Sequence, residues 1–174
     1  MIASIKKGLF MIIEVMLRIV IHPYIRARIF AVLGSKIGKN VRIYEVRLIN
    51  VENGFSNLTI DDDAHIGTGC IFDLKGMIFV GKGATLSPFV TILTHNDPGS
   101  HHNSPICNVY PPNVKSVFID EYCWIGCNST ILPGTHVKRS TVVGACSLVK
   151  GILEKECLYV GTPVKKVKGI TVSD

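Results

Sequence analysis

The sequence has few charged and few aromatic side chains, and these shortages exclude several classes of protein. Of its 174 residues, 18% are charged and 47% are hydrophobic, a balance that excludes an intrinsically disordered chain. It has no block of basic residues interleaved with aromatic ones, so binding to nucleic acid is not expected. The formal net charge of +6 instead suits an anionic small ligand or a membrane surface. The length fits one domain.

Cysteine is too sparse for a disulfide scaffold, because such scaffolds are short and dense in cysteine. The six cysteines include Cys123 and Cys127, which form a C-x3-C pair, but no second pair completes a zinc site. We therefore expect free thiols in a reducing cytoplasm and no structural metal.

The N-terminal segment lacks a clear signal for export or for spanning a membrane. An apolar stretch from Gly8 to Ile21 follows two lysines, but Glu14 and Arg18 interrupt it and no small-residue cleavage site follows. The stretch is also too short and too charged for a membrane-spanning helix.

What this segment does have is helical periodicity. Glu14 and Arg18 are four residues apart and can pair on one helix face. Pro23 is expected to end the helix, and a second one is expected from Tyr24 to Leu33, before Gly34. Two interpretations stay open, a helix packed on the main domain and a helix lying on a membrane interface. The apolar residues at helical spacing are Ile5, Leu9, Ile12, Met16, Ile19 and Val20.

After Gly34 the period changes to six residues. Each step opens with an aliphatic residue and a small or polar one, and the longest run has six consecutive steps, at Ile119, Ile125, Ile131, Val137, Val143 and Val149. Earlier steps begin at Ile37, Ile43, Ile60, Ile66, Val80, Leu86 and Ile92. Four positions after the aliphatic residue, a small or β-branched residue recurs at Val41, Ala64, Cys70, Ala84, Val90, Cys123, Ser129, Thr135, Thr141 and Ser147.

This period predicts a parallel β-helix, in which each hexad makes one short strand and one turn. The aliphatic side chain points into the narrow interior, and the next residue is expected at a tight corner where glycine adopts unusual φ/ψ angles freely. Open ends and flat outer faces predict covering elements and oligomers. The register slips at residues 45–58, around residues 73–77 and most extensively at about 94–117. The last segment, a polar loop broken by prolines, is expected to be functional.

Four segments of the C-terminal half resemble the hexapeptide-repeat acetyltransferases. They read WIG at 124–126, ILPG at 131–134, VGACSLV at 143–149 and GTPVKK at 161–166. The sugar O-acetyltransferases are the most similar branch, with the maltose, galactoside, nodulation, capsule and colanic-acid types. The segment RIFAVLGSKIGKNV at 28–41 resembles the lead-in of the capsule type.

The resemblance implies a left-handed β-helix at residues 34–174 behind a helical segment at 1–33. It implies a cytoplasmic homotrimer with active sites between neighbouring subunits. The expected activity is transfer of acetyl from acetyl-CoA to a sugar hydroxyl in surface or capsular polysaccharide biosynthesis. Peripheral contact with the inner face of a membrane is the alternative use of the N-terminal helix.

The resemblance also assigns a general base, His95, at the start of the large loop. A sugar hydroxyl is a weak nucleophile until its proton is removed, and an imidazole can remove it near neutral pH. Asp97 or a distant carboxylate could orient the imidazole, although an Asp before Pro98 is also typical of a turn. Asp73 is similar in position to a sugar-binding Asn of galactoside-type relatives. The expected substrate-binding residues are Asp73, Asn96, Asp97, His101 and His102, and either of these two histidines could replace His95 as the base.

The donor-binding residues are expected in the C-terminal coils. Trp124 resembles the aromatic residue beside the pantetheine arm, and Ala145 matches a position whose backbone N–H bonds that arm. Lys165 and Lys166 match a basic stretch near the CoA phosphates. At 147–151 the sequence reads SLVKG, so Lys150 stands where relatives often have Thr, and its phosphate contact depends on a local shift.

Two other functions use the same coil. The γ-type carbonic anhydrases hold zinc with three histidines, which invites comparison with His65, His95, His101 and His102. In that family one His is followed by two more that are five residues apart, and this spacing is not met, so no metal is assigned. A non-catalytic scaffold is the other alternative. Among acceptors, a soluble oligosaccharide, an antibiotic, serine or an amino-sugar nitrogen stay open.

Overall fold

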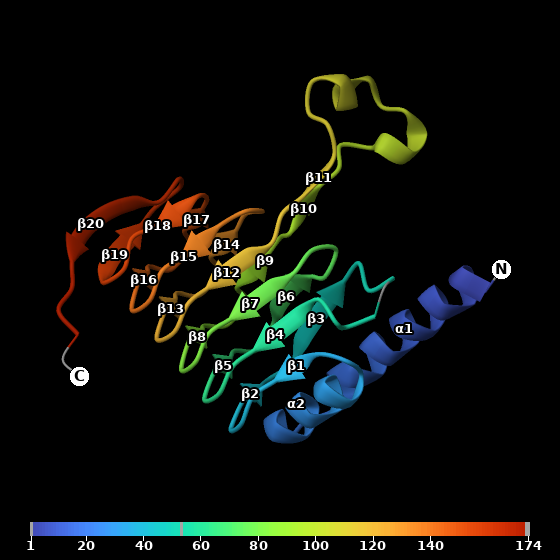
Figure 1. The fold of residues 1–174 in the computed structure, drawn as a ribbon, viewed down its shortest axis with the longest axis horizontal. Helices are drawn as coiled ribbons and strands as arrows, with labels where there is room; N and C mark the ends of the chain where they lie inside the picture. The colour runs from blue at the N-terminus through green and yellow to red at the C-terminus, as the bar shows by residue number, and fades with distance from the viewer. Residues whose placement is uncertain (1, 53, 173–174) are drawn as a thin grey trace.

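The chain forms a parallel β-solenoid with two helices at its N-terminal end and one long hairpin projecting from its side (Figure 1). The computed structural model describes residues 2–52 and 54–172, with side chains of α1 described from residue 8 onward. The helices are α1 (Ile2–Ile19) and α2 (Pro23–Val32).

Three parallel sheets form the sides of the solenoid; each of the first five coils contributes one strand to each sheet, and the last coil contributes strands to the first and second sheets. The first sheet contains β1 (Lys36–Ile37), β4 (Leu58–Ile60), β7 (Ile78–Val80), β12 (Val117–Ile119), β15 (His136–Val137) and β18 (Ile152–Leu153). The second contains β2 (Arg42–Ile43), β5 (His65–Ile66), β8 (Thr85–Leu86), β13 (Trp124–Ile125), β16 (Val142–Val143), β19 (Cys157–Val160) and the antiparallel β20 (Lys165–Gly169). The third contains β3 (Val46–Ile49), β6 (Cys70–Asp73), β9 (Thr91–Ile92), β14 (Thr130–Ile131) and β17 (Leu148–Val149).

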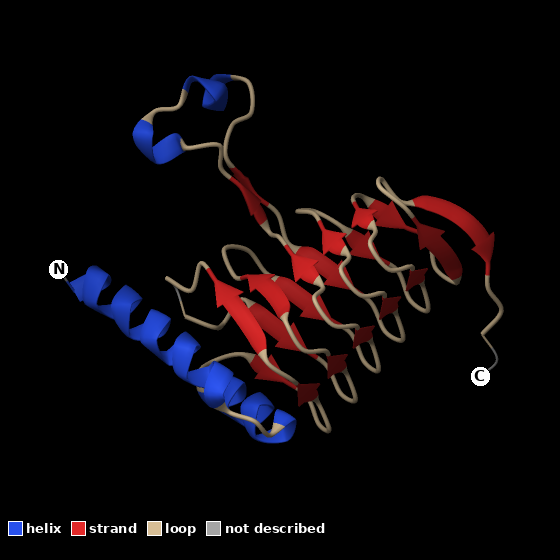
Figure 2. Ribbon diagram, turned by 180° about the vertical axis from the view of Figure 1, so that it is seen from behind, coloured by secondary structure: helices blue, strands red, loops and turns tan. Residues whose placement is uncertain are grey.

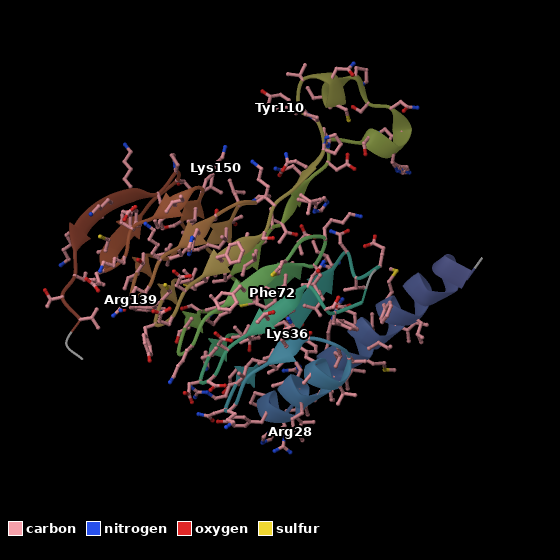
Figure 3. The ribbon with its side chains drawn as sticks, in the orientation of Figure 1. Arg28, Lys36, Phe72, Tyr110, Arg139 and Lys150 are labelled. Carbon is pink, nitrogen blue, oxygen red and sulfur yellow. The ribbon has the colours of Figure 1, made fainter. Side chains whose placement is uncertain are left out.

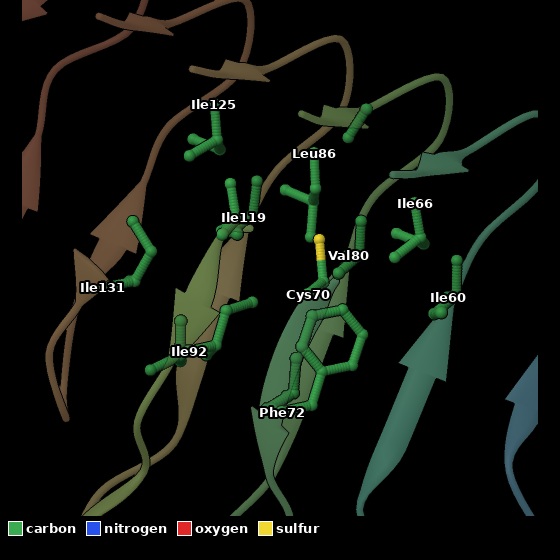
Figure 4. Packing of buried hydrophobic residues seen from close by; sticks show 14 of the residues in the cluster. Ile60, Ile66, Cys70, Phe72, Val80, Leu86, Ile92, Ile119, Ile125 and Ile131 are labelled. Carbon is green, nitrogen blue, oxygen red and sulfur yellow. The ribbon is translucent and has the colours of Figure 1, made fainter. Parts of the chain in front are cut away.

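The interior confirms the predicted hexads. The aliphatic residues that open the six consecutive steps are at most 1% exposed, and all ten small or β-branched residues four positions later are also buried. Successive coils stack these side chains directly, as Ile60, Val80 and Ile119 do on the first sheet (Figure 4). Ile37 is only partly buried, because it lies in the first coil beside the helices.

The glycine that follows an aliphatic residue was predicted to adopt unusual φ/ψ angles, and this prediction was wrong. The left-handed residue of each turn lies three positions after the aliphatic one, where Tyr122, Asn128 and Ser140 have φ of 59°, 55° and 53°. The glycine instead permits close stacking of turns. A Cβ on Gly126 would lie only 2.5 Å from the backbone N of Ala145 in the next coil.

All three predicted register slips occur at one corner, where the chain passes from the third sheet to the first. We call it corner 3/1. The extra residues follow β3, β6 and β9 in the first three coils. The longest forms a hairpin of β10 (His95–Asn96) and β11 (Asn113–Val114), with the 3-10 helices η1 (Ser100–His102) and η2 (Pro105–Asn108) near its tip (Figure 2). The solenoid therefore tolerates insertions at this corner without disturbing its core.

Helix α1 packs on the first coil, but not through the predicted stripe. Its inner face holds Phe10, Ile13 and Leu17, whereas Leu9, Ile12, Met16 and Ile19 of that stripe are more than half exposed. The side chain of Ile5 lies outside those described. The predicted ion pair is present, with Nε of Arg18 donating to Oε1 of Glu14 at 3.0 Å.

Two buried charged residues fix the helices on the coil. Oε1 of Glu14 accepts the backbone N–H of Leu48 at 2.9 Å. The Arg26 guanidinium donates to the backbone oxygens of Leu17, Val20 and Ile43. One hydrophobic cluster runs from the helices into the coil. The division of the chain into a helical segment at 1–33 and a β-helix domain at 34–174 stays a prediction.

Neither helix, over its described residues, is long and apolar enough to cross a membrane. All six cysteines are free thiols. Burial raises the pKa of Cys70 to about 11 and that of Cys123 to about 12, so both are thiols at neutral pH.

The stacking explanation predicts the effect of a single methyl group. Gly126→Ala should lower the free energy of unfolding by about 1–3 kcal/mol, because the new Cβ collides with the next turn. Gly8→Ala is the matched control, since nothing lies within 4 Å of its added Cβ and alanine favours the helix. Thermal or denaturant unfolding measures both, and an unchanged Gly126→Ala variant would contradict the explanation.

Candidate active site

The strongest cluster of polar side chains lies at corner 3/1, where three successive coils each contribute one residue. Asn50 follows β3, Asp73 ends β6, and His95 begins the hairpin after β9. Because β3, β6 and β9 are neighbours in one parallel ladder, the chain places these residues above one another.

Asp73 is the centre of this cluster and its side chain is fully buried. Its Oδ1 accepts hydrogen bonds from Nδ2 of Asn50 at 2.7 Å and from the backbone N–H of Lys75 at 3.1 Å. Its Oδ2 accepts the backbone N–H groups of Thr94 and His95 at 2.9 and 3.0 Å. Burial alone would raise the pKa of Asp73, but the hydrogen bonds from His95, Asn50 and the backbone lower it below its usual value.

The imidazole of His95 completes the shell of Asp73. Its Nδ1 lies 2.5 Å from Oδ2 of Asp73. An ionised carboxylate can only accept hydrogen bonds, so Nδ1 carries a proton in this pair and the neutral ring has its lone pair on Nε2. The His95 side chain is 27% exposed, which leaves the ring accessible from solvent. The geometry is that of a general base oriented by a carboxylate.

Thr94, next to His95, bonds the backbone of the preceding coil. Its hydroxyl donates to the backbone oxygen of Asp73 at 2.8 Å and accepts the N–H of Gly76 at 2.8 Å. Sequence reasoning missed Thr94 and Asn50. The only signal that could have found them is that the register slips share one corner, so the residues beginning each insertion must stack.

An open pocket of about 700 Å³ lies between the base of the hairpin and the coil beside His95. Asn96, Asp97, Tyr110 and Lys115 contribute polar groups to its lining, and Leu93 and Val109 contribute apolar ones. Tyr110 lies on the projecting hairpin, on the same side of the coil as Lys150 (Figure 3). The pocket thus offers hydrogen-bonding groups and an aromatic surface within reach of the imidazole.

The structure revises several expected roles. Asp73, expected to bind sugar, has no exposed side-chain surface, and its Oδ2 lies 2.5 Å from Nδ1 of His95, where a carboxylate can orient the imidazole. Asp97 is a turn residue, because its carboxylate accepts the N–H groups of Gly99 and Ser100 at 2.9 and 2.7 Å. Hydrogen bonds from the backbone and hydroxyl of Ser100 lower the pKa of Asp97 to about 2.

His101 and His102 lie in η1, near the tip of the hairpin, and do not line the pocket at His95. Both are exposed and their rings stand 5.6 Å apart, centroid to centroid. His65 lies on the second sheet in β5, against Tyr44. In the part of the chain that the structure describes, no three His, Cys, Asp or Glu side chains are grouped closely enough to hold a metal ion.

The expected donor-binding residues, except Lys150, lie away from corner 3/1. Trp124, 54% exposed on β13 of the second sheet, donates from Nε1 to Oγ of Ser87 at 3.0 Å. Ala145 is exposed at the corner between the second and third sheets, and its N–H meets no acceptor in the described part of the chain. Lys165 and Lys166 are exposed on β20, whereas Lys150 is exposed at corner 3/1. In one chain, Trp124 therefore lies on the sheet opposite the corner that carries His95.

Comparison with known proteins gives a consistent result. No family model matches the sequence. The chain is 29% identical over 118 residues to WbbJ of Escherichia coli K12, named a putative lipopolysaccharide biosynthesis O-acetyl transferase. That match covers 64% of the chain and 57% of WbbJ, so the chain spans a little over half the length of this relative.

A second relative, from Escherichia coli, is named dTDP-4-amino-4,6-dideoxy-D-glucose acyltransferase. It is 29% identical over 82% of the chain and 75% of its own length. Among solved structures, a hexapeptide-repeat acetyltransferase of Vibrio cholerae in complex with acetyl-coenzyme A matches with a TM-score of 0.81. That match is 16% identical and covers 97% of this chain and 89% of the other. The fold of this chain is therefore the hexapeptide-repeat acetyltransferase fold.

The buried carboxylate predicts a pH-dependent stability. Since the pKa of Asp73 is lowered in the fold, its hydrogen bonds stabilise the protein above the unfolded pKa of about 3.9 and are lost as pH falls through the lowered folded value. Asp73→Asn should lower the free energy of unfolding at pH 7 by about 1.5–3 kcal/mol, and the gap to the wild type should shrink towards pH 3.

Thermal unfolding at several pH values measures that gap. Asp63→Asn is the control, because its side chain is exposed and asparagine tolerates its left-handed φ of 61°, so its replacement should move the midpoint little. A gap between wild type and Asp73→Asn that stays constant down to pH 3 would contradict the proposed carboxylate network.

Proposed function

We propose that this homologue of sugar acetyltransferases, with the hexapeptide-repeat acetyltransferase fold, transfers acetyl from acetyl-CoA to a sugar hydroxyl in surface or capsular polysaccharide biosynthesis. The observation that carries the proposal is the pair of His95 and the buried Asp73 at the mouth of the hairpin pocket. The names of the sequence relatives support the acceptor class, and the Vibrio cholerae structure supports the donor.

The mechanism follows from the protonation of the His95–Asp73 pair. Nδ1–H of His95 donates to Asp73, so Nε2 is free to take the proton of an acceptor hydroxyl as its oxygen attacks the thioester carbonyl. Acetyl-CoA supplies the acyl group and a thiolate leaving group. The buried Asp73 carboxylate stabilises the imidazolium formed, which then returns its proton to the departing sulfur. No covalent intermediate on the protein is needed.

The acyl donor fits residues of the coil. The exposed ring of Trp124 is held by Ser87 and offers a flat surface for the pantetheine arm. The free N–H of Ala145 offers one hydrogen bond to an amide of that arm. Lys165 and Lys166 offer point charges for the phosphates of CoA.

A homotrimer is part of this proposal. Trp124 and Ala145 lie on sides of the solenoid away from corner 3/1, so one chain cannot bring its own donor-binding surface to its own His95. A neighbouring copy can supply the missing surface at a cleft between parallel solenoids. We propose a cytoplasmic location, which the six free thiols support, with peripheral contact at the inner face of a membrane through α1.

Removal of the base should abolish most turnover without affecting donor binding. His95→Ala should lower kcat by about 10²–10⁴-fold, the usual contribution of a positioned general base. Thiol release from acetyl-CoA, measured with a panel of oligosaccharides and nucleotide-linked sugars, reports turnover. His22→Ala, at an exposed histidine between the helices, is the control. Near-normal turnover in His95→Ala, with loss in His101→Ala or His102→Ala, would move the base to the hairpin tip.

Acetyl-CoA alone should stabilise the protein, because a ligand at 100 times its dissociation constant contributes about 2.7 kcal/mol. For a chain of this length the melting midpoint should rise by roughly 5–10 °C. Trp124→Ala should lose most of that rise. The matched control is Tyr122→Asn, at an equally exposed aromatic residue two positions earlier whose left-handed φ asparagine tolerates. No rise in the wild type would contradict the assigned donor.

A further inference from the structure

The outer face of α1 is an exposed apolar surface that the proposed mechanism does not use. From Gly8 to Ile21, every exposed residue of the described chain is hydrophobic, with no charged or polar side chain among them. These residues are Leu9, Met11, Ile12, Val15, Met16, Ile19 and Ile21, and each is at least 54% exposed. Two shallow grooves on this face have only apolar side chains in their lining. Contiguous exposed apolar surface of this kind marks an interaction site.

The exposure of this face is fixed by the packing of the helix. Glu14 and Leu17 point inward, where the Glu14 carboxylate binds the backbone N–H of Leu48 and Arg26 binds the backbone oxygen of Leu17. Rotating the helix to bury its apolar side would break these bonds and expose Phe10, which packs on Phe55 with ring centroids 5.7 Å apart. These contacts therefore hold the helix in an orientation in which its apolar side faces outward.

The charge around this face favours an anionic surface. Residues 1–33 contain five Lys or Arg and only one acidic residue, so they carry +4 of the formal net charge of +6. Lys6 and Lys7 precede the apolar face in the sequence, and Arg28 is exposed on α2. A second copy meeting this face in a symmetric contact would bring the same basic segments together, whereas anionic lipid headgroups would attract them.

The dimensions fit a helix lying in the plane of a bilayer. Its 18 residues extend about 27 Å, and from residue 8 onward one side is apolar and exposed while the other packs on the coil. Helices with an apolar face and nearby basic residues bind at the boundary between headgroups and acyl chains.

We infer that the outer face of α1, through Ile12 and Met16 and their exposed neighbours, binds an anionic lipid bilayer and presents the His95 site to a saccharide carried on a lipid. The inner face of the same helix lies against the insertion at corner 3/1, because Phe10 packs on Phe55 five residues after Asn50. Asn50 and His95 are two coils apart, about 10 Å along the stack. The preference for a lipid-borne acceptor rests on the proposed function, whereas the membrane surface does not.

Co-sedimentation of the full chain with vesicles tests the surface directly. Wild type should sediment with vesicles of phosphatidylglycerol and phosphatidylcholine, should sediment much less with phosphatidylcholine alone, and should be released by salt. Ile12→Gln/Met16→Gln should lower the bound fraction about tenfold, because glutamine keeps the helix but not the apolar face. Met77→Gln/Ile152→Gln replaces the same two residue types at exposed positions elsewhere and should bind like wild type.

Three results would overturn the inference. Wild type could fail to sediment with anionic vesicles, or the Ile12→Gln/Met16→Gln variant could sediment as well as wild type. The third is that this variant changes the oligomeric state in analytical ultracentrifugation, which would make the face a contact between copies. Circular dichroism confirms that the variant is folded, and Lys6→Gln/Lys7→Gln, which keeps the apolar face, should independently weaken binding to anionic vesicles.

The outcome separates this surface from the proposed reaction, since vesicle binding needs no acetyl-CoA. Sedimentation with vesicles, together with no thermal shift by acetyl-CoA, would support the membrane-binding surface and contradict the proposed acetyltransferase activity. A thermal shift by acetyl-CoA without sedimentation would support the acetyltransferase activity and contradict the membrane-binding surface.

Discussion

The register of the stacked coils is the constraint on which the rest of the structure depends. Each coil must place an aliphatic side chain directly above its equivalent, because the interior is one side chain wide and leaves no room for a displaced residue (Figure 4). The turns obey the same rule, since Gly126 has no space for even one added carbon. Extra residues can therefore leave the solenoid only at a corner, and the first three coils use the same one.

That constraint also builds the pair of Asp73 and His95. An insertion at one corner in three successive coils brings Asn50, Asp73 and His95 into one stack, although they are far apart in the sequence. A buried carboxylate is unfavourable unless hydrogen bonds surround it, and here backbone N–H groups and two side chains do so. The same bonds that keep Asp73 ionised hold the imidazole by Nδ1. The hydrogen bonds of Asp73 therefore both stabilise the corner and orient the imidazole of His95.

The sequence predicted the periodic part of this structure well, because burial of every sixth residue leaves a direct trace in residue type. The end of α1 and both ends of α2 were predicted to within a few residues, because Pro23 and Gly34 interrupt the helical pattern. It predicted the contacts of irregular segments less well. Asp73 was expected to touch substrate, since a lone carboxylate at a slip shows nothing of its partners. The face by which α1 packs was also missed, because apolar spacing shows that a helix is amphipathic but not which side meets the core.

The rigidity of the solenoid sets what a single chain can do within the proposed function. Loops at corner 3/1 can lengthen, but the sheets cannot bend to bring Trp124 or Ala145 round the solenoid to His95. The base of the hairpin borders the pocket beside His95, whereas its tip, with η1 and η2, projects away from the coil (Figure 2). In the proposed reaction, a neighbouring copy supplies the donor-binding surface, because the rigid solenoid keeps His95 apart from Trp124 and Ala145 of the same chain.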